Sequence, residues 1–139
     1  MSVSVLIVDD NEMDRYLLRR NLAKCSFDIV SFEVADGQFA IEYFEEHSRR
    51  RQLEPERYPP LVIFLDVNMP RVDGFGFLER FSDIRAANEL KSTVVVMFTS
   101  SPRQEDKDRS RQWSFVRDFI VKGEFSPDDL DRIFLNLAA

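Results

Sequence analysis

The chain has 139 residues, of which 44% are hydrophobic and 32% are charged, and its formal net charge is −6. This length fits one domain over residues 1–139, and the negative charge disfavours binding to nucleic-acid phosphates. One cysteine and one histidine exclude an internal disulfide, a zinc cluster and a multi-histidine metal site. The sequence has no apolar run long enough to span a membrane and no export signal, so we expect a cytoplasmic protein with no membrane or nucleic-acid partner.

Five short apolar segments predict β-strands, at residues 3–8, 29–34, 61–65, 94–98 and 119–121. Continuous runs of apolar and β-branched residues are typical of strands that are buried on both faces of a parallel sheet. Polar residues interrupt the segment 29–34, which indicates a strand at the edge of that sheet.

Helical patterns lie between and after these segments, at residues 11–24, 38–50, 74–88, 103–113 and from 127 onward. Asn11 is expected to cap the first helix, and the acidic Glu12 and Asp14 fit the positive end of that helix. Three prolines within 52–60 predict a loop before the third strand. The alternation of strands and helices predicts an α/β fold, in which a doubly wound parallel sheet lies between two layers of helices.

Polar residues follow four of the five predicted strands, and they are Asp9, Asp10, Asp66, Thr99 and Lys122. The carboxyl ends of parallel strands meet at one edge of the sheet, which is where open α/β folds bind their ligands. We therefore expect these residues to form one site, although more than a hundred positions separate the first from the last.

The three carboxylates of this predicted site cannot all stay ionised at close range unless a cation binds between them. A small set of oxygen ligands favours Mg²⁺, and the backbone carbonyl of Asn68 can add one more ligand. Lys122 supplies an ammonium and Thr99 a hydroxyl donor. This combination predicts phosphoryl transfer, with Asp66 as the nucleophile that becomes an aspartyl phosphate.

Four short motifs occur in order along the chain: Val-Asp-Asp at 8–10, Leu-Asp-Val-Asn-Met-Pro-Arg-Val-Asp-Gly at 65–74, Phe-Thr-Ser at 98–100 and Phe-Ile-Val-Lys at 119–122. Each motif alone is weak, but the four together are specific at the spacing of alternating strands and helices. The chain resembles a response-regulator receiver domain over about residues 4–137. The resemblance implies a flavodoxin-like, three-layer α/β/α fold whose five parallel strands have the order 2-1-3-4-5.

The resemblance also implies that Asp66 accepts a phosphoryl group from a sensor histidine kinase, and that Asp9, Asp10 and Asp66 hold Mg²⁺. It further implies a switch in which Thr99 moves toward the phosphate and Phe119 turns inward behind it. The long, proline-bearing connection before the third strand and the Thr-Ser pair after the fourth resemble the stand-alone regulators that serve bacterial phytochrome-type kinases.

Because no residues remain for an output domain, we expect a stand-alone regulator in a two-component phosphorelay that signals to an unknown downstream protein through protein contacts. It would not be an enzyme beyond its own phosphorylation and dephosphorylation. Two alternatives remain open. A Mg²⁺-dependent phosphatase with an aspartyl-phosphate intermediate would need a second aspartate where Asn68 stands. A degenerate receiver would act only as a binding module, and the presence of every expected site residue disfavours it.

The sequence departs from the receiver pattern at two places. Gly123 follows Lys122 where receivers usually carry a proline in a cis peptide. Because a cis bond without proline costs about 2.5–4 kcal/mol, we expect either a trans bond with a rearranged loop or a strained cis bond. Residues 103–112 include no apolar side chain, which predicts a loosely held fourth helix with Trp113 as its main anchor.

Two further sets of residues are candidates for regulation. Asn68 and Ser101 lie where receivers tune the lifetime of the phosphate. Trp113 and Phe115 are expected to present an apolar patch to a partner, or to a second copy in a homodimer formed through the fourth helix and the fifth strand.

Overall fold

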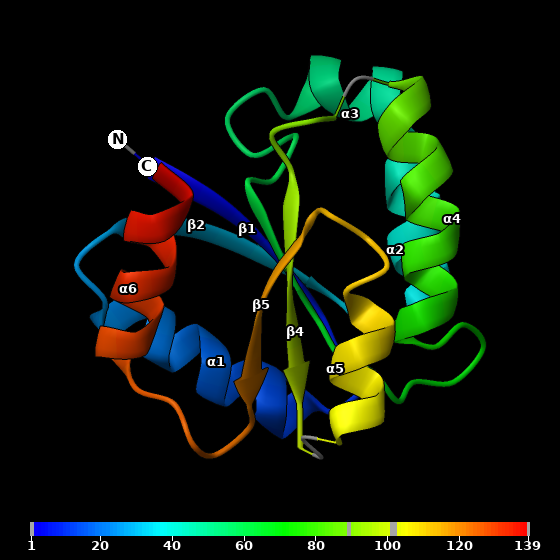
Figure 1. The fold of residues 1–139 in the computed structure, drawn as a ribbon. Helices are drawn as coiled ribbons and strands as arrows, with labels where there is room; N and C mark the ends of the chain where they lie inside the picture. The colour runs from blue at the N-terminus through cyan, green and yellow to red at the C-terminus, as the bar shows by residue number, and fades with distance from the viewer. Residues whose placement is uncertain (1, 89, 101–102, 139) are drawn as a thin grey trace.

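The computed structural model describes residues 2–88, 90–100 and 103–138. Within these residues the chain forms the following elements (Figure 1): β1 (Ser2–Val8), α1 (Glu12–Lys24), β2 (Asp28–Val34), α2 (Gly37–Glu45), α3 (His47–Leu53), β3 (Val62–Leu65), α4 (Gly74–Ala87), β4 (Val94–Thr99), α5 (Gln104–Ser110), β5 (Val116–Val121) and α6 (Pro127–Ala138). The strands form one parallel sheet in the order β2-β1-β3-β4-β5. The predicted fold class and strand order are confirmed.

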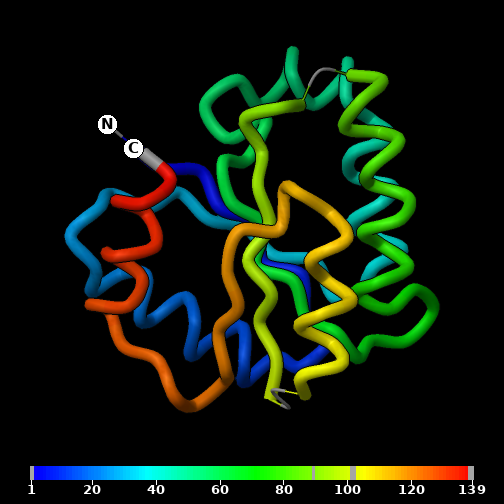
Figure 2. Tube along the Cα trace, viewed as in Figure 1, coloured from blue at the N-terminus to red at the C-terminus, as the bar shows by residue number. Residues whose placement is uncertain are grey.

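The sheet separates two apolar cores, because successive side chains of a strand point to opposite faces. In β1, Leu6 and Val8 belong to the core beneath α2 and α4, whereas Val5 and Ile7 belong to the core beneath α1 and α6. The trace in Figure 2 shows α1 and α6 on one side of the sheet, and α2, α4 and α5 on the other. Burial on both faces explains why β3 and β4 are continuous apolar runs.

At the start of α1, α2 and α4, a polar side chain accepts a hydrogen bond from a backbone N–H in the first turn. Asn11 accepts from the N–H of Asp14 at the start of α1, Asp36 from Phe39 in α2, and Asp73 from Gly76 in α4. Each bond satisfies a donor that the helix itself leaves free. The predicted cap at Asn11 is confirmed.

The helix predicted over 38–50 is two helices, which is a correction to the sequence-based expectation. α2 ends at Glu45 and α3 begins at His47, with a non-helical Glu46 (φ −86°, ψ 26°) between them. The apolar stripe that docks α2 ends at Phe44, and α3 has no buried residue. The chain can therefore change direction where it has no further apolar side chain to bury.

The helix predicted over 103–113 is shorter, since α5 covers Gln104–Ser110 and Ser110 is its one buried residue. Trp113 follows α5, is half-buried and stacks on Phe75 of α4 with ring centroids 6.4 Å apart. The loose attachment of this helix remains a prediction. Among the helices that the structure describes, none combines the length and apolar character needed to cross a bilayer.

The register of the strands places the predicted site residues at one edge of the sheet. Val8 of β1 pairs with Leu65 of β3, and the N–H of Asp66 donates to the carbonyl of Val8 over 2.9 Å. Asp9 and Asp66, the next residues along these strands, are therefore neighbours. On β4 and β5, Thr99 pairs with Val121, so that Lys122 leaves the sheet on the same side.

Candidate functional site

Three acidic side chains meet directly after β1 and β3. One carboxylate oxygen from each of Asp9, Asp10 and Asp66 lies within 4.8 Å of the other two. Asp9 is fully buried and Asp66 is 5% exposed, whereas Asp10 is exposed. The structure thus brings together the three carboxylates that the sequence predicted.

Lys122 reaches this cluster from the end of β5. Its Nζ atom lies 2.7 Å from Oδ2 of Asp9 and 3.4 Å from Oδ1 of Asp66. It also lies 2.9 Å from Oδ2 of Asp14, in the first turn of α1. The sequence-based expectation places Asp14 only at the positive end of the helix, so this contact with Lys122 is new. The position of Asp14 one turn after the carboxylate pair was a signal that this residue faces the same edge.

The peptide bond between Lys122 and Gly123 is trans, since the one cis bond within the described residues joins Tyr58 and Pro59. Gly123 adopts φ 80°, a left-handed conformation that glycine enters without a steric penalty. The trans alternative is therefore the one found, and it leaves the Lys122 ammonium within reach of the carboxylates.

The loop from β3 to α4 is held closely against Asp66. A Cβ atom on Gly74 would lie 2.4 Å from the carbonyl oxygen of Asp66, and the N–H of Gly74 donates to the carbonyl of Val67 over 2.8 Å. Glycine is required at this close approach of two backbone segments. Asn68 lies in the same loop and is exposed, so its carbonyl remains a candidate ligand.

Burial and charge pairing shift the pKa values of the two buried carboxyl groups and of Lys122. The pKa of Asp66 is raised to about 7, because burial and then the charge of Asp9 raise it more than Lys122 lowers it. Burial also raises the pKa of Asp9. Burial lowers the pKa of Lys122, but its contacts with Asp9 and Asp14 outweigh that effect and raise it. The site therefore holds more negative charge than one ammonium neutralises.

The donor set fits Mg²⁺. All the clustered ligand atoms are carboxylate oxygens, which hard divalent cations prefer. Oδ2 of Asp9 is buried, and the charge that it meets within the described residues is the Lys122 ammonium at 2.7 Å. A cluster of buried carboxylates with surplus negative charge suits a divalent cation.

Thr99 is the last residue of β4, and Phe119 lies within β5, three residues before Lys122. Thr99 is fully buried, and its carbonyl accepts a hydrogen bond from the N–H of Lys122 over 2.7 Å. Phe119 is half-buried, and the ammonium of Lys107 lies 5.5 Å from its ring centroid. Ser101, the second candidate for phosphate lifetime, lies outside the described residues.

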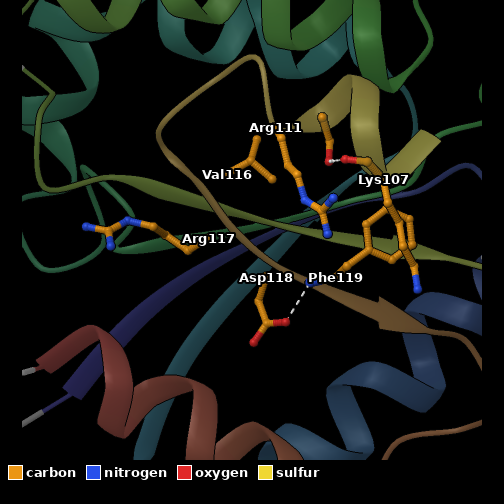
Figure 3. Close-up of a pocket in the computed structure, with 7 residues that line it drawn as sticks. Lys107, Arg111, Val116, Arg117, Asp118 and Phe119 are labelled. Atoms are coloured by element: carbon orange, nitrogen blue, oxygen red, sulfur yellow. Dashed lines mark hydrogen bonds between the residues drawn. The ribbon is translucent and has the colours of Figure 1, made fainter. Parts of the chain in front are cut away.

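The apolar patch expected at Trp113 and Phe115 is not found, because Phe115 is 4% exposed. Its ring packs edge-on against Phe81 at 5.6 Å, so the side chain is part of the core. The surface between α5 and β5 instead holds a groove of about 340 Å³ beside Phe119. Figure 3 shows the basic side chains that line it, which are those of Lys107, Arg111 and Arg117.

Comparisons with known proteins agree with this geometry. Chemotaxis protein CheY of Bacillus subtilis is 28% identical over 133 residues, which are 96% of this chain and 92% of that protein. The solved structure of the bacteriophytochrome response regulator RtBRR is 28% identical, covers 100% of this chain and 80% of its own, and has a TM-score of 0.73.

A third likeness is to the receiver domain of the sensor histidine kinase PA1611 from Pseudomonas aeruginosa PAO1. That structure has magnesium coordinated in its active-site cleft. It is 20% identical with a TM-score of 0.74 and covers 100% of both chains, which shows a shared fold. The family model of the response regulator receiver domain matches residues 5–134. The chain therefore belongs to the response regulator receiver domain family.

Proposed function

We propose that this chain is a phosphoacceptor in a two-component system, and that Asp66 takes the phosphoryl group from the phosphohistidine of a sensor histidine kinase. One observation carries the proposal. The buried Asp66 carboxylate shares a 4.8 Å cluster with those of Asp9 and Asp10, and the Lys122 ammonium lies 3.4 Å from it. The family match supports the same role.

In the proposed step a carboxylate oxygen of Asp66 attacks phosphorus. A P–O bond forms, the P–N bond to the kinase histidine breaks, and the imidazole nitrogen keeps the electron pair. Asp66 must be ionised to attack, and its pKa of about 7 leaves much of it protonated at neutral pH. The positive charge of Lys122 favours the ionised form and meets the charge that develops on the phosphoryl oxygens.

Asp9, Asp10 and Asp66 are the residues that would hold Mg²⁺, with the Asn68 carbonyl as a further ligand. The bound ion would supply neutralising charge to the phosphoryl oxygens. The magnesium in the related Pseudomonas receiver supports this assignment. The same residues must lose protons to bind the ion, so Mg²⁺ and an ionised Asp66 favour each other.

We further propose that Thr99 and Phe119 carry the change in phosphorylation state to the groove between α5 and β5. The groove is lined by Phe119 and by basic side chains. A movement of the Phe119 ring would therefore change the shape of this surface. The downstream protein, or a second copy of the chain, would read that change. Sedimentation with and without a phosphodonor would show whether the second copy is used.

We also propose that the cognate kinase is of the phytochrome type. The likeness to the bacteriophytochrome response regulator, together with the long, proline-bearing connection before β3, supports this. Phosphotransfer from an autophosphorylated phytochrome-type kinase should be faster than transfer from a chemotaxis-type kinase under the same conditions. Equal rates from both kinases would contradict the assignment.

Phosphorylation with acetyl phosphate and Mg²⁺ tests the proposed function. The intact mass of the wild type should increase by one phosphoryl group, while Asp66→Asn shows no increase. Asp83→Asn on α4 is the matched control, because it removes an exposed carboxylate and should leave phosphorylation unchanged. Labelling of Asp66→Asn to the wild-type level would overturn the assignment of Asp66, and turnover of phosphate esters by the wild type would indicate a phosphatase instead.

A further inference from the structure

Lys122 contacts three carboxylates, and one of them is not part of the candidate metal cluster. Its Nζ atom lies 2.7 Å from Asp9, 2.9 Å from Asp14 and 3.4 Å from Asp66. Asp9 and Asp66 belong to the cluster that could hold an ion, and Asp14 does not. Asp14 also has 28% of its side chain exposed, whereas that of Asp9 is fully buried.

A divalent cation and the Lys122 ammonium compete for the same carboxylates. The ammonium lies 2.7 Å from Oδ2 of Asp9, and Asp9 also belongs to the cluster that could hold an ion. A cation between Asp9, Asp10 and Asp66 would repel an ammonium a few ångströms away. Lys122 must then either move into solvent or transfer to a carboxylate outside the cluster.

Asp14 is held in a fixed position for that transfer. Its N–H donates to the side chain of Asn11 over 3.0 Å, which fixes the first turn of α1. The next residue, Arg15, donates to the carbonyl of Asp9 over 2.6 Å and pairs with Glu33 at 3.0 Å. The start of α1 is thereby tied to both β1 and β2.

The Lys122 side chain is confined between this turn and the sheet. Its Nζ lies 5.2 Å from the ring centroid of Phe98, and the side chain as a whole is 10% exposed. A shift of the ammonium away from Asp9 therefore leads toward Asp14, with which it is already paired.

We propose that Asp14 is a positioning residue that retains the Lys122 ammonium when Mg²⁺ occupies the carboxylates of Asp9, Asp10 and Asp66. This inference rests on the proposed function, because it concerns the same metal and phosphoryl site. Asp14 lowers the cost of moving Lys122 off Asp9, and it keeps the ammonium close enough to reach an incoming phosphoryl group.

A double-mutant cycle with Mg²⁺ affinity as its measurement tests the proposal. Isothermal titration calorimetry at constant ionic strength would give the Mg²⁺ dissociation constant for the wild type, Asp14→Asn, Lys122→Gln and the double variant. Asp14→Asn should weaken Mg²⁺ binding by about two- to fivefold when Lys122 is present, which is the range of a partly exposed ion pair. In the Lys122→Gln background the same substitution should have a smaller effect.

Glu12→Gln is the matched control, because it removes one negative charge from the same helical turn without a contact to Lys122 among those described. The change in the Mg²⁺ dissociation constant of Glu12→Gln measures the effect of losing one negative charge near the site. Asp14→Asn should change the dissociation constant by the same factor when Lys122 is replaced by Gln. Thermal unfolding by circular dichroism should show that Asp14→Asn is folded at the titration temperature.

An equal effect of Asp14→Asn in both backgrounds would overturn the proposal, because Asp14 would then act through its own charge alone. Absence of any effect with Lys122 present, or absence of Mg²⁺ binding to the wild type, would overturn it as well. Phosphorylation of the same wild-type sample, followed by intact mass, tests the proposed function separately. If Asp14 and Lys122 are coupled in Mg²⁺ binding but the wild type takes up no phosphoryl group, the role of Asp14 stands and the proposed phosphoacceptor function is wrong.

Discussion

The aromatic core beneath α4 and the carboxylate edge of the sheet differ in what they bury. Beneath α4, the rings of Phe44, Phe77 and Phe81 contact one another with centroids 4.7 to 6.2 Å apart, and all three are fully buried. At the edge of the sheet, Asp9 and Asp66 are buried instead. Burial of the rings stabilises the fold, whereas burial of like charges opposes folding.

The difference shows that stability and chemistry come from separate parts of one small domain. Apolar burial in the core stabilises the fold enough for the edge of the sheet to keep Asp9 and Asp66 buried, although their like charges repel each other. A cation at the edge should therefore add stability that the apolar core does not supply.

The largest effect is expected from removal of a ring in the core. Phe81→Ala should lower the free energy of unfolding by about 3–5 kcal/mol, because it leaves a cavity among packed rings. Urea unfolding followed by circular dichroism measures this change. Leu135→Ala on α6, where the leucine is 60% exposed, is the control and should stay within about 0.5 kcal/mol. Equal losses from both variants would argue against a core concentrated beneath α4.

Mg²⁺ should stabilise the folded chain through the edge alone. At a concentration one hundred times its dissociation constant, it should raise the free energy of unfolding by about 2.7 kcal/mol. Phe81→Ala should keep this gain if it still folds, and Asp66→Asn should lose most of it. The measurement is the same urea titration with and without Mg²⁺. A full gain in Asp66→Asn would place the bound ion elsewhere.

The pH dependence of the metal-free chain should reveal the cost of the buried Asp66 carboxylate. The pKa of Asp66 is raised from 3.8 to about 7 in the folded chain, so the folded state binds this proton more tightly than the unfolded state. The contribution of Asp66 to the free energy of unfolding is therefore fully present below pH 4, and it is lost as the pH rises from about 4 to about 7.

Asp66→Asn removes that loss, and at pH 8 without metal it should be about 1–3 kcal/mol more stable than the wild type. At pH 5 the two proteins should differ much less. Unfolding by urea at both pH values measures the difference. A variant that is less stable than the wild type at pH 8 would show that Lys122 compensates the buried charge fully.

The smallest effect concerns α5, which belongs to neither region. Arg109 lies with its guanidinium carbon 4.2 Å from the ring centroid of Phe75. Loss of this contact in Arg109→Ala should lower the free energy of unfolding by about 0.5–1 kcal/mol.

Amide hydrogen exchange should be faster in α5 than in α4, because Ser110 is the one buried residue of α5. Equal protection of the two helices would contradict the loose attachment predicted from the sequence.

Local patterns predicted most of the architecture correctly. The continuous apolar runs at 61–65 and 94–98 became the central strands β3 and β4, and Asn11 caps α1. These features depend on neighbouring residues, on the period of side-chain burial and on the preference of polar side chains for helix ends. The motifs that end the strands also identified Asp9, Asp10 and Asp66 as one cluster, because parallel strands end at a common edge.

The features that the sequence did not predict depend on contacts between segments that are far apart in the chain. The pairing of Lys122 with Asp14 joins residues that are 108 positions apart, and no local pattern specifies which carboxylate an ammonium reaches. The burial of Phe115 depends on Phe81 of α4, so the sequence around Phe115 could not show that its ring is inside the core.

The sequence alone therefore determined the order of the elements, the parallel sheet and the residue types at its functional edge. The tertiary structure decided the partners of Lys122, the burial of Phe115 and the trans bond before Gly123. The physical reason is that periodicity and capping act within a few residues. Charge pairing and packing instead depend on the three-dimensional positions of side chains that the fold brings together.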